Sequence, residues 1–105
     1  MIKKKYRKYL LTTQEQNKKT MDLKEEFEKA AADSKNLAEK PGNDILLQLY
    51  SLYKQGSIGD VNTEPPSNPF DFVNKAKHEA WAALKGKSTT DAMTEYIALI
   101  KKLKG

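Results

Sequence analysis

The sequence predicts an all-α fold, a bundle of four helices preceded by a basic N-terminal extension. Apolar residues recur at steps of three and four over four stretches, which begin near residues 22, 43, 72 and 89. Glycine or proline separates these stretches, and none of them has the alternating pattern of a strand. Four amphipathic helices joined in series bury their apolar faces together, so a helical bundle follows.

The first predicted helix begins at Asp22 and has acidic residues in its first turn, where the helix dipole favours them. Its apolar side is formed by Leu23, Phe27, Ala30, Ala31, Ser34 and Leu37. Pro41 and Gly42 interrupt the pattern, and Asn43 or Asp44 can cap the helix that follows.

The second predicted helix spans residues 43–57 and has two distinct faces. Its inward stripe is formed by Ile45, Leu46, Leu49 and Leu52. Tyr50, Tyr53 and Lys54 share an adjoining face because they are spaced by three and four residues. Two phenol rings beside an ammonium group suit a ligand that has both a flat ring and a phosphate. The alternative is that the tyrosines are half-buried core residues and the lysine is solvated.

A long proline-containing loop follows at residues 59–72, and a loop of this length in a small domain is often functional. The third predicted helix covers about 72–85, with Trp81 as its one large aromatic residue and Phe72, Ala76, Ala80, Ala83 and Leu84 as its other apolar positions. Ser88 is the predicted N-cap of the last helix, in a capping box with Asp91. The apolar side of that helix is formed by Ala92, Met93, Tyr96, Ile97, Ile100 and Leu103.

The net charge of +5 is concentrated near the N-terminus. Residues 1–20 carry seven basic side chains and one acidic side chain, whereas residues 21–105 carry 12 basic and 13 acidic side chains. We therefore predict a basic, solvated extension at 1–20 and a nearly neutral four-helix domain at 21–105. A neutral body lacks the basic face of a nucleic-acid-binding fold, so we expect no nucleic-acid partner.

Several classes of function are excluded by the residues that the chain lacks. It has no cysteine and one histidine, which excludes thiolate chemistry and leaves little for a metal site. No glycine-rich phosphate loop or serine-centred elbow is present, and His78 is expected to be solvated, so the sequence does not predict an enzyme. No apolar run is long enough for a membrane span or a signal-peptide core, which favours a cytoplasmic protein.

Seven short motifs occur in a fixed order over about residues 22–104. They are Tyr50-Ser-Leu-Tyr53-Lys54-Gln55, Gly59-Asp-Val-Asn-Thr-Glu64-Pro65, Lys75-Ala-Lys77, Ala80-Trp81, Leu84-Lys-Gly86, Ala92-Met93 and Tyr96-Ile97. Together they resemble the signature of the acyl-CoA-binding proteins, also called the diazepam-binding inhibitor family. Several ordered motifs are far more specific than any single one.

The resemblance implies a four-helix bundle whose shallow bowl binds long-chain acyl-CoA esters, without covalent chemistry or a cofactor, for buffering and intracellular transport. It implies a headgroup site in which Tyr50, Lys54 and Lys77 hold the ribose 3′-phosphate, Tyr53 lies near the adenine, and Tyr96 and Lys35 line the nucleotide side. Phe27, Ala30 and Leu47 match positions of the acyl groove.

The chain departs from the family pattern near this site. Pro65 stands where members often have a basic residue, and the loop is one residue longer than usual before Asp71. His78 follows Lys77 where a tryptophan is common. These differences affect ligand preference more than ligand class.

Two other functions stay open at this point. One is a helical interaction module that uses the basic extension to dock an acidic partner or a membrane surface. The other is an acyl-CoA-dependent enzyme, for which catalytic residues are missing. For the carrier we expect acyl-CoA as ligand, transient contact with acyl-CoA-using enzymes or membranes, and a monomer whose bowl stays accessible.

Overall fold

The structure is a computed structural model that describes residues 22–105, so the extension predicted at 1–20 lies outside the described residues. Within that range the chain forms four helices: α2 (Leu23–Ser34), α3 (Asn43–Ser57), α4 (Phe72–Ala82) and α5 (Thr89–Lys104). No strand occurs among residues 22–105. The all-α prediction is confirmed.

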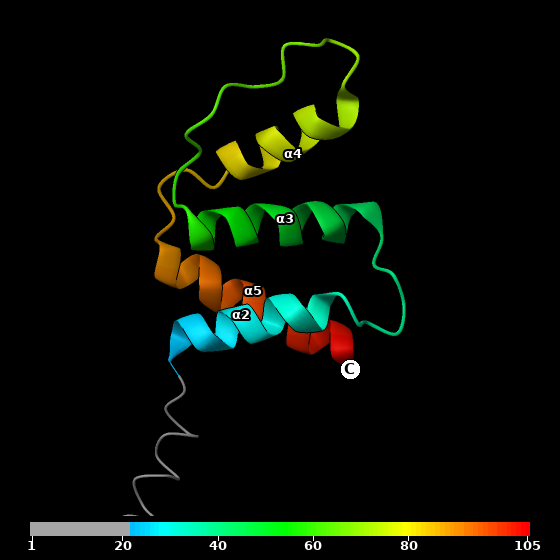
Figure 1. Ribbon diagram of the computed structural model, residues 1–105, viewed down its shortest axis with the longest axis vertical. Helices are drawn as coiled ribbons and strands as arrows, with labels where there is room; N and C mark the ends of the chain where they lie inside the picture. Colours follow the sequence, from blue (N-terminus) through cyan, green and yellow to red (C-terminus); the bar gives the residue numbers. More distant parts are fainter. Residues whose placement is uncertain (1–21) are drawn as a thin grey trace, which may run out of the picture.

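The helices form a bundle in which α3 is central. It packs against α5 and against α4, while α2 packs against α5. Figure 1 shows that α2 and α5 run in one direction and that α3 and α4 both run in the other. Because α3 and α4 are parallel neighbours, the chain must run from the end of α3 back to the level of its start before α4 can begin. This explains the long loop over residues 58–71.

Caps fix the helix starts that the sequence predicts. Ser88 is the N-cap of α5, and its hydroxyl accepts a hydrogen bond from the Asp91 backbone N–H at 3.0 Å. At the start of α2 the Glu25 carboxylate accepts from the Asp22 backbone N–H at 3.2 Å, which is the reciprocal bond of a capping box. These bonds satisfy backbone groups that the first turn of a helix leaves without partners.

Two predicted helix ends were wrong, and one apolar position of the third predicted helix is exposed. α2 ends at Ser34, so Leu37 lies in the connection to α3, and α4 ends at Ala82, so Leu84 lies in the turn that follows. Phe72, one of the apolar positions of the third predicted helix, is 70% exposed. The reason is that α3 is the one helix in the described chain against which α4 packs extensively, so α4 buries only a narrow stripe.

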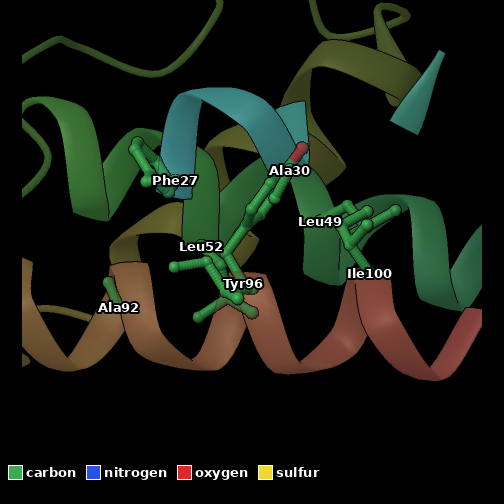
Figure 2. Packing of buried hydrophobic residues seen from close by; sticks show 8 residues of the cluster. Phe27, Ala30, Leu49, Leu52, Ala92, Tyr96 and Ile100 are labelled. Carbon is green, nitrogen blue, oxygen red and sulfur yellow. The ribbon is translucent and has the colours of Figure 1, made fainter. Parts of the chain in front are cut away.

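The hydrophobic core lies between α2, α3 and α5, as Figure 2 shows. Its buried members are Phe27, Ala30, Leu49, Leu52, Ala92, Tyr96, Ile97 and Ile100. Two of these rings pack with Tyr53 at the edge of the core: Phe27 stacks on Tyr53 with centroids 5.2 Å apart, and Phe27 meets Tyr96 edge-on at the same distance. Such aromatic pairs add about 0.5–1.5 kcal/mol beyond the area that they bury.

A polar cluster joins the end of α3 to the turn before α5. Gln55 is fully buried, and its Nε2 donates to the Lys87 carbonyl at 2.8 Å and to Asp60 Oδ1 at 2.9 Å. The Gly86 N–H donates to the same Asp60 oxygen at 2.9 Å. These two donors, Gly86 first, hold the pKa of Asp60 below its ordinary value because they stabilise the carboxylate.

α4 also holds the long loop in place. The Trp81 indole Nε1 donates to the Gly59 carbonyl at 2.8 Å, and Gly59 has a φ of 104°, a conformation that favours glycine. Nε2 of His78 donates to the Thr63 carbonyl at 2.8 Å, and the side chain is half-buried. His78 is therefore only partly solvated, because the loop folds back over this face of α4.

We predict that Gly56→Ala destabilises the protein by about 1–3 kcal/mol, the usual cost of overpacking a core. A Cβ at this position would lie 3.0 Å from Cζ of Phe27 and 3.2 Å from Cγ of Met93, both of which are packed between helices. The control is Gly42→Ala, where an added Cβ meets nothing within 4 Å. Urea unfolding of both variants measures the difference; equal stability would show that the α2–α3–α5 contact is looser than the structure indicates.

Candidate functional site

A cavity of about 590 Å³ lies between the helices on the side where α3 faces α4 and the end of α2. It is lined by Ala31, Ser34, Lys35, Leu37, Pro41, Leu46, Leu49, Tyr50, Tyr53, Lys77 and Tyr96. Five of the six residues that the sequence predicts for a headgroup site are among them: Lys35, Tyr50, Tyr53, Lys77 and Tyr96. The fold thus brings together side chains from α3, α4, α5 and the end of α2.

The sixth predicted residue, Lys54, lies beside the cavity and contacts Tyr50, which lines it. Its Nζ is 5.8 Å from the centroid of the Tyr50 ring and 5.5 Å from that of Trp81. Lys77 Nζ, from α4, lies 5.4 Å from the Tyr50 centroid. Two ammonium groups from two helices therefore converge on one phenol ring, in the geometry of cation–π contacts.

These lysines have no carboxylate partner within residues 22–105. The ion pairs of that range are Lys29–Asp33, Lys87–Glu95 and Lys104–Asp33. Lys35, Lys54 and Lys77 take part in none of them. Positive charges that converge without a neutralising carboxylate provide point charges for an anionic ligand.

Two aromatic residues form the wall between this cavity and the core. Tyr53 is 40% exposed, so part of its ring is available to a ligand while Phe27 stacks on it. Tyr96 is buried, and burial raises the pKa of its hydroxyl above the ordinary value, with a smaller opposing effect from the Ser34 side chain. The cavity therefore offers a flat surface beside its positive charges.

A second groove, of about 350 Å³, lies between the first turns of α3 and α4. It is lined by Asn43, Leu46, Leu47, Phe72, Val73, Ala76 and Lys77, so its walls are mostly apolar. Leu46 and Lys77 line both the groove and the cavity, so the two are adjacent. An elongated ligand with a charged end and an apolar end matches this pair.

The three residues predicted for an acyl groove do not lie together. Leu47 lines the apolar groove, whereas Phe27 and Ala30 are only 3% and 5% exposed and belong to the core. Direct contact of Phe27 or Ala30 with a ligand stays a prediction. In this structure both side chains lie behind the cavity wall, where they support Tyr53 and Tyr96.

Sequence reasoning missed part of the groove. Leu46 was assigned to the inward stripe of the second helix, Phe72 was named only as an apolar position of the third, and Val73 was not singled out. Adjacent large apolar residues at the start of α4 were a usable signal, because a helix that starts with Phe72 and Val73 cannot bury both against one neighbour. Only the packing of α4 on α3 shows that they line the groove.

Two further observations concern the described part of the chain. Residues 22–105 contain no group of three or more histidine, cysteine, aspartate or glutamate side chains that could hold a metal ion. Among the helices of that range, none has the length and apolar character needed to cross a bilayer.

The fold and the paired cavities define a small helical binding protein for an amphiphilic anion. The family model described as Acyl CoA binding protein matches residues 24–100. The chain is 47% identical over 85 residues to the acyl-CoA-binding protein of Ricinus communis. The aligned region covers 81% of this chain and 93% of that relative. This chain belongs to the acyl-CoA-binding protein family, as the sequence motifs predicted.

Solved structures agree with this assignment. The crystal structure of acyl-CoA-binding protein 2 from Oryza sativa superposes with a TM-score of 0.74 at 42% identity, over 80% of this chain and 90% of that one. The acyl-CoA-binding protein from Moniliophthora perniciosa gives a TM-score of 0.68 at 33% identity, over 78% of this chain and 84% of that one. The four-helix bundle of the acyl-CoA-binding protein type is confirmed.

We predict that the Tyr96→Phe variant loses less stability at alkaline pH than the parent protein does. A pKa raised by folding means that the neutral phenol is favoured in the native state, so its contribution is complete below the ordinary pKa of 10.0 and is lost as pH rises through the folded value. Thermal unfolding from neutral to alkaline pH measures this dependence. An alkaline limb of unchanged slope in the variant would contradict the burial of the Tyr96 hydroxyl.

Proposed function

We propose that this protein binds one long-chain acyl-CoA ester across the cavity and the adjoining apolar groove, and that it buffers and carries the ester unchanged. The observation that carries the proposal is the adjacency of a lysine- and tyrosine-lined cavity to an apolar groove, with Leu46 and Lys77 common to both. Acyl-CoA has the same division, with a phosphorylated nucleotide at one end and a fatty chain at the other.

In the proposed complex the ribose 3′-phosphate lies between Lys54 and Lys77, beside the Tyr50 hydroxyl. Both ammonium groups already lie within 6 Å of the Tyr50 ring centroid, so little rearrangement is needed to bring them onto one phosphate. The exposed part of Tyr53 is assigned to the adenine. Lys35 and Tyr96 complete the nucleotide side of the cavity.

The fatty chain is assigned to the groove lined by Leu46, Leu47 and Ala76. Burial of a chain there contributes roughly 25 cal/mol per Å² of apolar surface removed from water. The headgroup contacts and the chain contacts must act together in the intact ester. Free CoA lacks the second contribution and a free fatty acid lacks the first, so both should bind much more weakly.

No chemical step is assigned to the site. Members of the family to which the chain belongs are non-catalytic binders, and lysines with phenols supply binding and not a nucleophile with its base. No cofactor is needed for such binding. The comparisons support the carrier and give no support to the alternative of an interaction module built on the basic extension.

We also propose a domain division, an oligomeric state and a cellular location for the carrier. The family match begins at residue 24, which is compatible with an extension at 1–20 and a binding domain at 21–105. We propose a monomer because a partner over the cavity would block the ligand. A chain without cysteine is compatible with the reducing cytoplasm, where acyl-CoA-using enzymes and membranes are available for transient contact.

Calorimetric titration with palmitoyl-CoA, free CoA and palmitate tests the two-part site. We expect one-to-one binding of the ester and binding of either fragment that is weaker by at least about a hundredfold, since each fragment forfeits a contribution of several kcal/mol. Equal affinity for free CoA and for the ester would contradict the assignment of the chain to the groove.

The phosphate assignment has a sharper test in 3′-dephospho-palmitoyl-CoA. Lys54→Ala should lower the affinity for palmitoyl-CoA about tenfold or more, which is the usual effect of losing a charge-assisted hydrogen bond. The affinity for the dephospho ester should stay nearly unchanged. Lys24→Ala is the matched control, because Lys24 is exposed on α2 and lines neither cavity. A loss that is equal for both esters would place the 3′-phosphate away from Lys54.

A further inference from the structure

The most exposed of the large apolar side chains in residues 22–105 are concentrated at the start of α4. Phe70, Phe72 and Val73 are 77%, 70% and 65% exposed, whereas the other exposed large apolar residues, Ile58 and Tyr53, are 48% and 40% exposed. We call these three residues the α4 patch. Contiguous exposed apolar surface on a small protein marks an interaction site more often than chance.

The α4 patch is held in place by specific bonds. The two phenylalanine rings lie perpendicular to each other with centroids 6.5 Å apart. Asn68 Oδ1 accepts from the Phe70 backbone N–H at 2.9 Å, and Asp71 Oδ1 accepts from the Asn74 N–H at the start of the helix at 3.3 Å. The rings are therefore presented by a capped helix and a bonded turn, which lowers the entropy lost when they enter a partner.

The patch is continuous with the apolar groove. Phe72 and Val73 line that groove together with Leu46 and Leu47, so they belong both to its wall and to the outer surface. Figure 1 shows the start of α4 beside the start of α3, at the end of the bundle opposite the turn between α4 and α5. A fatty chain that leaves a bilayer at this end would pass from lipid to groove without crossing water.

The local charge indicates which kind of surface fits. Asp44 in the first turn of α3 and Asp71, the N-cap of α4, are the acidic groups at this end, and Lys75 and Lys77 follow on α4, so the formal charges of these four groups sum to zero without any ion pair between them. A surface without net charge around the α4 patch gives no long-range attraction to an acidic partner or to anionic lipid. Phenylalanine side chains enter the interfacial region of a bilayer by burying apolar area, a contribution that does not require anionic lipid.

We propose that Phe70, Phe72 and Val73 form a docking surface that inserts into the interface of a neutral phospholipid bilayer, with the groove mouth facing the lipid. This surface differs from the basic extension, whose attraction to a membrane would depend on anionic lipid and low salt. The inference that the docked face loads the groove rests on the proposed function, whereas the docking itself does not require ligand.

The test uses the full chain without ligand and vesicles of phosphatidylcholine. Two variants place a reporter on an exposed apolar position: Phe70→Trp in the patch, and Ile58→Trp as matched control. Ile58 is 48% exposed and caps the far end of α3, about 20 Å from the patch by the rise of the helix. Bromine-labelled lipids quench only tryptophans that reach the bilayer, and the native Trp81 is buried and gives the background.

We expect quenching of Phe70→Trp that exceeds the background and is insensitive to salt, with none for Ile58→Trp. In a flotation assay Phe70→Ser should reduce vesicle binding about tenfold, as expected when a mostly exposed phenylalanine no longer enters lipid. Binding that requires anionic lipid and disappears at high salt would overturn the proposal in favour of the basic extension. Absence of binding, or equal quenching of both reporters, would also overturn it.

Acyl-CoA titration of Phe70→Ser in vesicle-free buffer separates the two proposals. Phe70 lines neither the cavity nor the groove, so this variant should keep the affinity of the parent protein. Docking that fails while ligand binds would sink only the docking proposal. Ligand binding that fails in the parent protein would sink the proposed function and leave the docking result to stand by itself.

Discussion

The parallel packing of α4 on α3 is the constraint on which the site depends. It brings Lys77 from α4 to the ring of Tyr50 on α3, where Lys54 approaches from the same helix. It also sets the first turns of the two helices side by side and so creates the apolar groove. An antiparallel pair joined by a short turn would set the start of α4 beside the end of α3, and the lysine and the groove would no longer lie together.

This arrangement requires a long connection, and the chain stabilises that connection at several points. Trp81 holds its start through Gly59, His78 holds its middle through Thr63, and Asp71 caps the helix at its end. Such bonds reduce the entropy that a long irregular segment would otherwise retain. The residues that close the loop thus support the packing of α4 on which the site depends.

The core and the cavity share a wall. Tyr53 and Tyr96 line the cavity, and both rings pack against Phe27 inside the bundle. A ligand that contacts this wall binds the folded state only, so it must raise stability by mass action. The positive character of the cavity is likewise local, because the described domain is close to neutral and its lysines act through their placement and not through net charge.

The sequence by itself determined the helices and the family. Periodic apolar residues and caps such as Ser88 act over a few residues, so four helices could be located from local pattern, and the ordered motifs identified the family. Tertiary structure decided what local pattern cannot contain. It exposed Phe72, because α4 has one main neighbour; it half-buried His78 under the returning loop; and it placed Phe27 and Ala30 behind the cavity wall. Burial depends on which elements meet, and that is fixed by contacts between residues distant in the chain.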